Sequence, residues 1–365
     1  MPAPRENISV ALGERSYEIE IGTGNLSGIA EFAAARRKLS HAVVITDEHV
    51  EPLHGQAVAA SLTAADIRVD VLVMEAGESS KSVEVAGLLW EKLLDVGADR
   101  KSVVFAVGGG VIGDLAGFAA AGFARGIALM QVPTTLLAQV DSSVGGKVGV
   151  NLPGAKNMVG AFWQPAGVLI DTAVLATLPD REYRSGLAEV VKYGVILDAD
   201  FFAWLEGHTA EIAARQDEAL RYVVARCCRL KADVVERDER EETGTRAVLN
   251  YGHTFCHAFE TLTGYGQLLH GEAVSIGMMC AARLAEELGR IDGGLAQRQQ
   301  ALLTALELPV DVPALSHDDI IAVMARDKKT AHGKLRFVLP TRLGHVELVS
   351  DVPTEHVRTA LSGGC

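Results

Sequence analysis

Two histidines stand four residues apart in a segment whose apolar spacing is typical of an α-helix. They are His253 and His257, and side chains four residues apart leave the same face of a helix, one turn from each other. A carboxylate, Glu189, stands in another segment with helical spacing. Two imidazoles and one carboxylate form the ligand set of an open zinc site, whose fourth position is left for water or substrate. These residue types therefore indicate metal-assisted chemistry.

The sequence around the histidine pair favours a metal site over the simpler alternative, in which paired helical histidines pack or face solvent. Further polar residues crowd around the pair, namely Arg246, Asn250, Glu260 and His270. The segment His253–His257 lacks the glutamate of the zinc-protease helix, so peptide hydrolysis is not indicated. Spacing alone selects His253 and His257 together as the two imidazole ligands.

A glycine-rich turn follows a short apolar run. Val103–Val107 leads into Gly108–Asp114 and then into a stretch rich in alanine and glycine. Glycines between a strand and a helix let backbone amides approach a pyrophosphate, which the helix N-terminus also attracts. The order of the glycines is not that of the usual dinucleotide fingerprint. A tight strand-to-helix turn without a ligand is therefore the alternative.

Two other polar loops end apolar runs in the same way. Thr46–Glu48 follows one run and Gly77–Lys81 follows another. Together with the glycine-rich turn, these loops would lie at the C-terminal edge of a parallel sheet, where open α/β folds bind ligands. Their convergence at one edge favours a cofactor site more strongly than any single loop does.

Cationic and amide side chains lie among small and apolar neighbours after this turn. Lys147 follows two glycines, but the phosphate-loop pattern of nucleoside triphosphatases is absent. The groups that would instead hold a substrate phosphate are Arg125, Lys147, Lys156 and Asn157. Lys231 lies beside the apolar stripe of a helical stretch, where a lysine either extends to surface water or binds a ligand.

The first half of the chain alternates strand and helix patterns. Ile8–Leu12 and Tyr17–Ile21 alternate like a hairpin. The amphipathic stretch Val83–Val96 predicts a helix. Further strands are predicted at 42–46, 69–73, 103–107, 128–132 and 168–170. This alternation predicts a parallel sheet with helices on both faces.

The pattern changes near residues 178–182. Helices are predicted beyond this point at about 181–196, 209–237, 248–262, 271–288 and 294–307, and only Leu335–Leu339 still resembles a strand. We therefore predict an α/β domain over residues 1–180 and a helical domain over residues 181–365.

Composition limits the classes of partner. The chain has 365 residues, 48% of them hydrophobic, and a mean hydropathy of +0.19, which is typical of a compact globular protein. Its net charge of −13 argues against a nucleic-acid or anionic-membrane surface. The five cysteines are odd in number and form no CxxC pair, which suits a reducing cytoplasm. The N-terminal residues lack the apolar core of a signal peptide, and no apolar run is long enough to span a membrane.

Five motifs together resemble the 3-dehydroquinate synthase family of sugar-phosphate cyclases. The motifs are Gly108–Asp114, Pro133–Lys147, Gly186–Gly194, Asn250–His253 and Arg326–Lys329. The resemblance as a whole spans roughly residues 40–345 and keeps the family's order and spacing. The resemblance implies an N-terminal Rossmann-like α/β domain followed by an all-helical C-terminal domain. This agrees with the organisation that the residue patterns predict.

The resemblance also implies a reaction. The family converts 3-deoxy-D-arabino-heptulosonate 7-phosphate to 3-dehydroquinate and phosphate, the second step of the shikimate pathway. NAD oxidises a hydroxyl transiently, phosphate leaves by β-elimination, the hydride returns, and an intramolecular aldol reaction closes the ring. Oxidation makes the neighbouring C–H acidic, while zinc polarises the oxygen that is oxidised and reduced. The implied cofactors are NAD and Zn²⁺, with Co²⁺ as a substitute.

The resemblance implies a role for each matching residue. It places the metal on Glu189, His253 and His270, and so replaces the choice that spacing alone makes. The implied catalytic and substrate-binding residues are Arg125, Asp141, Lys147, Asn157, Lys192, Lys231, Arg246, Asn250 and His257. The residues implied to bind NAD are Asp47, Glu78, Lys81, Gly110, Val111, Ile112, Gly113, Asp114, Thr134, Thr135, Lys147, Lys156 and Thr177.

Within this set, Arg246 and Lys231 match positions at the substrate carboxylate. Arg125 matches a residue of the phosphate site, in its own or the neighbouring subunit of a homodimer. The sequence departs from the family at Cys256, where glycine is usual, and at Ala155. Neither change removes a charged or ligating group.

Three rival functions remain open. A cyclase acting on sedoheptulose 7-phosphate would use the same zinc and NAD, but its substrate has no carboxylate. A metal-dependent polyol dehydrogenase would not need so many phosphate-binding cations. A non-catalytic NAD-binding regulator would have no reason to keep the metal and phosphate residues together. The expected partner is a phosphorylated sugar acid, and neither nucleic acid nor a membrane.

Overall fold

The computed structural model describes residues 5–264, 266–327 and 335–363. Two compact units divide the chain, one formed by residues 1–179 with 217–240 and the other by 180–216 with 241–365. The domain division predicted from the sequence places residues 217–240 in the helical domain, whereas in the structure they belong to the first unit. A domain boundary at residue 180 stays a prediction. Lys328 and Lys329 of the last motif, and Cys365, lie outside the described residues.

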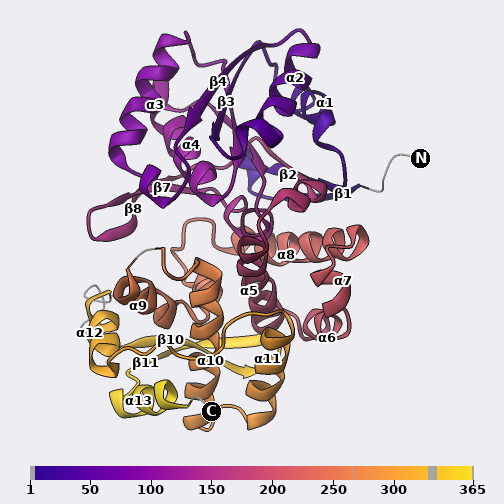
Figure 1. The fold of residues 1–365 in the computed structure, drawn as a ribbon. Helices are drawn as coiled ribbons and strands as arrows, with labels where there is room; N and C mark the ends of the chain where they lie inside the picture. The colour runs from indigo at the N-terminus through magenta and orange to yellow at the C-terminus, as the bar shows by residue number, and fades with distance from the viewer. Residues whose placement is uncertain (1–4, 265, 328–334, 364–365) are drawn as a thin grey trace. The chain divides into compact units, whose positions relative to one another are not determined.

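The first unit is built on a seven-stranded sheet (Figure 1). Its strand order is β1-β2-β9-β6-β5-β3-β4, and every pairing is parallel except that of β1 with β2. The strands are β1 (Glu6–Val10), β2 (Tyr17–Gly22), β3 (His41–Asp47), β4 (Arg68–Met74), β5 (Val103–Gly108), β6 (Ala128–Pro133) and β9 (Gly167–Asp171). All seven strand predictions, including the N-terminal hairpin, are confirmed.

Both faces of this sheet are covered because side chains alternate along each strand. On β3, Val43 and Ile45 pack into one apolar cluster with α3 (Val83–Asp95) and α4 (Gly110–Gly122). The intervening side chains of β3 pack on the other face with α1 (Ile29–Ala34) and α2 (Gln56–Ala64). The two helical layers are visible in Figure 1 on either side of the sheet.

The strands end at a common level. Asp47 pairs with Met74 at the ends of β3 and β4, and Gly108 pairs with Pro133 at the ends of β5 and β6. The helices that follow β3 and β5 lie on opposite faces of the sheet. The loops after these two adjacent strands therefore diverge, and such a switch point is where open α/β sheets bind ligands.

Two parts of the first unit were not expected from the sequence. A two-stranded antiparallel hairpin, β7 (Lys147–Leu152) and β8 (Ala155–Phe162), follows the sheet-edge loops. The helix α8 (Asp217–Arg237) packs against this unit although it comes later in the chain. One long helix was expected at 209–237, but Arg215 adopts a left-handed backbone with φ of 53° and separates α7 (Thr209–Ala213) from α8.

The second unit is mainly helical. Its helices are α5 (Asp180–Leu197), α6 (Ala199–Gly207), α7, α9 (His253–Thr263), α10 (His270–Glu287), α11 (Gly293–Ala305), α12 (His317–Asp327) and α13 (Thr354–Ser362). The expected strand at 335–339 is part of a hairpin, β10 (Arg336–Arg342) with β11 (His345–Ser350). Among the described residues, no helix is long and apolar enough to cross a membrane.

Candidate active site

Three elements of the second unit bring a carboxylate and two imidazoles together. Glu189 lies on α5, His253 is the first residue of α9, and His270 is the first residue of α10. The Oε1 atom of Glu189 is 3.6 Å from Nε2 of His253 and 3.7 Å from Nε2 of His270. Among the described residues, these three form a group whose donor atoms all lie within 4.8 Å of one another.

These separations fit a tetrahedral metal ion. Oxygen and nitrogen ligands at about 2.0–2.2 Å from zinc lie about 3.4 Å from one another. The two measured separations exceed that value by a few tenths of an ångström, so small side-chain movements would complete the coordination. One carboxylate with two imidazoles also leaves a fourth position open.

Hydrogen bonds orient both imidazoles for such a role. Nδ1 of His253 lies 3.1 Å from the Tyr251 carbonyl oxygen, and Nδ1 of His270 lies 3.4 Å from Oε1 of Glu260. Both acceptors require an N–H on Nδ1, so the lone pair of each ring is on Nε2 when that ring is neutral. Outer hydrogen bonds of this kind fix the tautomer of metal-binding histidines and make them more basic ligands.

The protonation state of His253 suits metal binding. Burial and, to a smaller extent, the neighbouring Lys192 ammonium lower its pKa to about 3. His253 is therefore neutral near pH 7. Lys192 is buried and forms an ion pair with Oε2 of Glu189, while Oε1 of the same carboxylate faces the histidines. The lysine thus holds Glu189 ionised without occupying the oxygen that faces the two rings.

His257 lies outside this triangle. It stands one turn after His253 on α9, its side chain is exposed, and the two rings meet edge-on with centroids 5.7 Å apart. Asn250 is exposed at the end of a short 3₁₀ turn (Thr245–Asn250). In the same turn, Arg246 is buried and its Nε lies 3.7 Å from Oε1 of Glu241.

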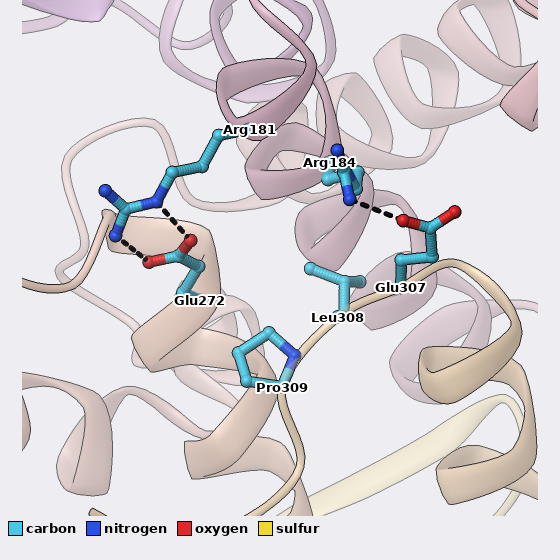
Figure 2. A pocket seen from close by; sticks show the side chains of 6 residues that line it. All are labelled: Arg181, Arg184, Glu272, Glu307, Leu308 and Pro309. Atoms are coloured by element: carbon cyan, nitrogen blue, oxygen red, sulfur yellow. Dashed lines mark hydrogen bonds and ion pairs between the residues drawn. The ribbon is translucent and has the colours of Figure 1, made fainter.

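A bidentate ion pair fixes the start of α10, and with it His270. Arg181 binds both carboxylate oxygens of Glu272 at 2.7 Å and also donates to the Gln267 carbonyl oxygen. Glu272 in turn accepts a hydrogen bond from the Leu269 amide. Figure 2 shows this pair beside Arg184 and Glu307, across a cavity of about 260 Å³. Both arginines that line this cavity are paired with carboxylates, so neither offers an unpaired charge to a substrate phosphate there.

Predicted cofactor residues of the first unit gather at the carboxyl edge of its sheet. Lys81, in the loop before α3, forms an ion pair with Asp114 in the first turns of α4, and Glu78 accepts a hydrogen bond of 2.7 Å from Asn151. Burial raises the pKa of Asp114, and Lys81 opposes this effect. The carboxylate of Asp47 accepts hydrogen bonds from the amides of the two residues after Glu48, at 2.9 and 3.0 Å.

The glycine-rich turn leaves backbone amides uncovered at the start of α4. Gly109 is the N-cap, and no side chain of the described residues caps the helix there. A Cβ at Gly108 would lie 2.6 Å from Cβ of Ile112, and one at Gly110 would lie 3.1 Å from Oγ of Ser142. The turn therefore requires small residues. Val111, Ile112 and Gly113 continue it as the first turn of α4.

Buried hydroxyl groups at this edge fit a bound polar group. Oγ1 of Thr46 and Oγ1 of Thr134 are buried and have no hydrogen-bond partner within the described ranges. Buried polar atoms are nearly always satisfied, so such atoms at a sheet edge indicate a missing ligand or water. Thr135 caps the Ala138 amide, and Thr177 pairs with His54 at 2.8 Å.

The remaining predicted residues lie elsewhere in the first unit. Lys231 of α8 is buried, and its ammonium contacts the carbonyl oxygen of Asp141 at 2.7 Å and Oδ1 at 2.9 Å. The alternative in which Lys231 extends to surface water is therefore wrong. Hairpin β7–β8 carries Lys147, Lys156 and Asn157. Arg125 is exposed and lies in a turn with a φ of 69°.

Sequence reasoning missed two supporting groups, the Tyr251 carbonyl and Arg181. It named Glu260 as a polar neighbour of the histidine pair but did not predict its contact with His270. The one local signal was Glu272, because a glutamate three residues into a helix is typical of a capping arrangement.

Family models match most of the chain. The model described as 3-dehydroquinate synthase N-terminal matches residues 71–185, and that described as 3-dehydroquinate synthase C-terminal matches residues 186–330. A 3-dehydroquinate synthase of Rhodopirellula baltica is 53% identical, over 99% of this chain and 98% of that protein. The chain belongs to the 3-dehydroquinate synthase family.

Solved structures of related cyclases share the fold. The 2-epi-5-epi-valiolone synthase of Streptomyces hygroscopicus subsp. jinggangensis 5008, solved with NAD⁺ and Zn²⁺, is 32% identical with a TM-score of 0.88, over 96% of this chain and 97% of that one. A 2-deoxy-scyllo-inosose synthase complexed with carbaglucose-6-phosphate, NAD⁺ and Co²⁺ is 28% identical with a TM-score of 0.90, over 99% and 100%. The predicted fold class is confirmed by these likenesses.

Proposed function

We propose that this chain is an enzyme that converts 3-deoxy-D-arabino-heptulosonate 7-phosphate to 3-dehydroquinate and phosphate, as a carbon–oxygen lyase. The observation that carries the proposal is the triangle of Glu189, His253 and His270 donor atoms in a chain so similar to known synthases. This reaction needs metal ligands, groups that orient the ligating imidazoles, and a separate cofactor site such as the sheet edge offers.

Glu189, His253 and His270 would hold one divalent ion. Their hard and borderline donors suit Zn²⁺, with Co²⁺ as a substitute, and both ions occur in the related cyclase structures. When bound, the ion would polarise the substrate oxygen that undergoes transient oxidation. Lys192 keeps Glu189 ionised, and Tyr251 and Glu260 hold the two imidazoles in the ligating tautomer.

NAD would bind at the switch point of the first unit. The amides of Gly110, Val111 and Ile112 would hold the pyrophosphate, which a helix N-terminus attracts. Gly113, whose amide donates to the Gly109 carbonyl oxygen, would line the same site. The unsatisfied hydroxyl of Thr134 supports the presence of a ligand at this edge. The remaining NAD-binding residues would be Asp47, Glu78, Lys81, Asp114, Thr135, Lys147, Lys156 and Thr177.

The substrate would be held by the cations and amides around these two sites. Arg246 and Lys231 would bind its carboxylate end, and Arg125, Lys147 and Asn157 would bind its phosphate. The ion pair with Asp141 fixes the position of the buried Lys231 ammonium in advance. Lys192, Asn250 and His257 complete the catalytic set, His257 as a proton-transfer or phosphate-contacting group. We further infer a cytoplasmic homodimer, and the absence of a disulfide at Cys227, Cys228, Cys256 and Cys280 agrees with a reducing compartment.

One assay tests the proposed function. The zinc-loaded protein is given the heptulosonate phosphate with catalytic NAD, and phosphate, dehydroquinate and NADH are measured together. We expect equal amounts of phosphate and dehydroquinate without accumulated NADH, because the hydride returns to the substrate. NADH rising in step with product would instead identify a polyol dehydrogenase. NAD binding without any turnover would identify a regulator.

Substitution of Arg246 tests which substrate is used. A guanidinium grips a planar carboxylate through two parallel hydrogen bonds, which a lysine ammonium cannot reproduce. Such a contact is worth about 1.5–3 kcal/mol, so Arg246→Lys should raise KM about tenfold or more. Bound zinc, measured by metal analysis, should be unchanged. Efficient cyclisation of sedoheptulose 7-phosphate by the unaltered enzyme would assign it to the other cyclase class.

A further inference from the structure

A second group of ligating atoms lies on the opposite side of His270. Sγ of Cys256 is 3.9 Å from Nδ1 of His270 and 3.8 Å from Oε2 of Glu260. Nδ1 of His270 is 3.4 Å from Oε1 of Glu260. All three donor atoms lie within 4.8 Å of one another, so one imidazole faces two clusters through its two nitrogens.

The dimensions of this group suit a metal ion that prefers sulfur. With zinc–sulfur bonds of about 2.3 Å and zinc–nitrogen bonds of about 2.0 Å, tetrahedral ligands lie about 3.4–3.6 Å apart. The measured separations are within a few tenths of an ångström of this range. Cys256 and Glu260 are buried, whereas the His270 side chain is 34% exposed and offers a route for an entering ion.

We propose that Cys256, Glu260 and Nδ1 of His270 form a second site, for a thiophilic divalent cation such as Cd²⁺ or excess Zn²⁺, whose occupation removes His270 from the catalytic metal. The predicted inhibition rests on the proposed function, whereas binding of the cation to the second site does not require catalysis. A soft thiolate ligand binds such ions more strongly than the oxygen and nitrogen ligands of the catalytic site do.

Proton accounting explains why the two sites exclude each other. An ion entering the second site displaces the Cys256 thiol proton to solvent and takes the Nδ1 lone pair of His270. The imidazole proton moves from Nδ1 to Nε2, so Nε2 no longer has a lone pair to offer the catalytic ion. Glu260 changes from hydrogen-bond acceptor to ligand. Starting from a neutral His270 ring, one proton is released for each ion bound.

The first experiment measures binding without any activity. Metal-free protein is titrated with Cd²⁺, and the thiolate-to-metal charge-transfer absorption is followed. Cys280→Ser is the matched control, because Cys280 is also a fully buried helical thiol but belongs to neither ligand group. We expect the absorption band in the parent protein and in Cys280→Ser, and its loss in Cys256→Ser. An equal band in Cys256→Ser would overturn the proposal.

The second experiment measures the functional consequence. The zinc-loaded enzyme is exposed to excess Cd²⁺, and the remaining dehydroquinate formation and retained zinc are measured. We expect inactivation with zinc loss in the parent and in Cys280→Ser, and at least tenfold weaker inhibition in Cys256→Ser. Equal inhibition of both variants would overturn the exclusion mechanism. Should Cys256→Ser fold poorly, Cys256→Ala is used, and X-ray absorption of the Cd²⁺-bound parent must show one sulfur ligand.

The two sets of results separate this inference from the proposed function. Absence of dehydroquinate formation by the zinc-loaded parent would count against the proposed function and leave the Cd²⁺ titration unaffected. Absence of a thiolate band would count against the second site while dehydroquinate formation continued.

Discussion

Replacing His253 with alanine is expected to remove both the bound metal and turnover, whereas His257→Ala should keep the metal and lose turnover alone. His253 contributes one of three protein donors, and its Nε2 lies 3.6 Å from the Glu189 oxygen that completes the group. Losing an outer partner of a metal ligand already costs about 10- to 100-fold in affinity. Losing the ligand itself should cost more, and metal analysis after dialysis would detect it.

The contrast with His257 has a physical basis in its position. Its exposed ring meets His253 edge-on, and it is not a member of the ligand group that Glu189, His253 and His270 form among the described residues. Removing a group that transfers protons lowers kcat by about 10²–10⁴-fold without disturbing a metal centre. His356→Ala is the control, because this histidine is paired with Glu287 on another face of the unit. Equal metal loss in the His253 and His257 variants would show that the metal assignment is wrong.

A single methyl group at Gly271 should separate two of the metal ligands. A Cβ there would lie 1.8 Å from the Ser185 carbonyl oxygen, which is backbone and cannot rotate away. Because Ser185 is on α5 and Gly271 on α10, the two helices must move apart. Glu189 and His270 lie on these same helices, so Gly271→Ala should weaken metal binding by about 10- to 100-fold. Loss of a group that hydrogen-bonds to a metal ligand has an effect of this size.

The stability of the Gly271→Ala variant should fall as well. Overpacking of this kind costs about 1–3 kcal/mol, which a denaturation midpoint would report. Gly207→Ala is the matched control, since a Cβ there would meet nothing within 4 Å. That control should be as stable as the parent or up to about 1 kcal/mol more stable. Unchanged chelator competition in Gly271→Ala would contradict the argument.

Local patterns predicted the sheet of the first unit well because each strand carries its own signal. β3 alternates side chains between two apolar clusters, and the turn after β5 is marked by consecutive glycines. Hairpin β7–β8 gave no such signal. Gly149 and Gly160 face each other in this antiparallel pair, and a Cβ at either would lie 2.7 Å or less from a backbone oxygen of the facing strand. Close approach of two backbones, rather than an alternating pattern, defines this pair.

The site shows the same division between local and distant information. Helical spacing compares only residues within a few turns, so it selected His257, which lies on the same helix as His253. The Glu189 carboxylate and His270 reach His253 from α5 and α10, and periodicity carries no information on that meeting. Lys231 is similar, since its burial depends on Asp141 of a distant segment. Only the long motifs of the family resemblance linked these positions before the structure did.

The placement of α8 determines when the first unit can be completed during synthesis. Arg229 donates to the Ser9 carbonyl oxygen, Glu236 accepts from the Ala11 amide, and Lys231 neutralises Asp141. A nascent chain that stops at residue 180 therefore leaves the N-terminal hairpin and the Asp141 carboxylate without these partners. The first unit can be completed only after α8 has been synthesised, and α5, α6 and α7 of the other unit are synthesised before α8. Any fragment intended to isolate the first unit needs residues 217–240, joined by a linker that replaces residues 180–216.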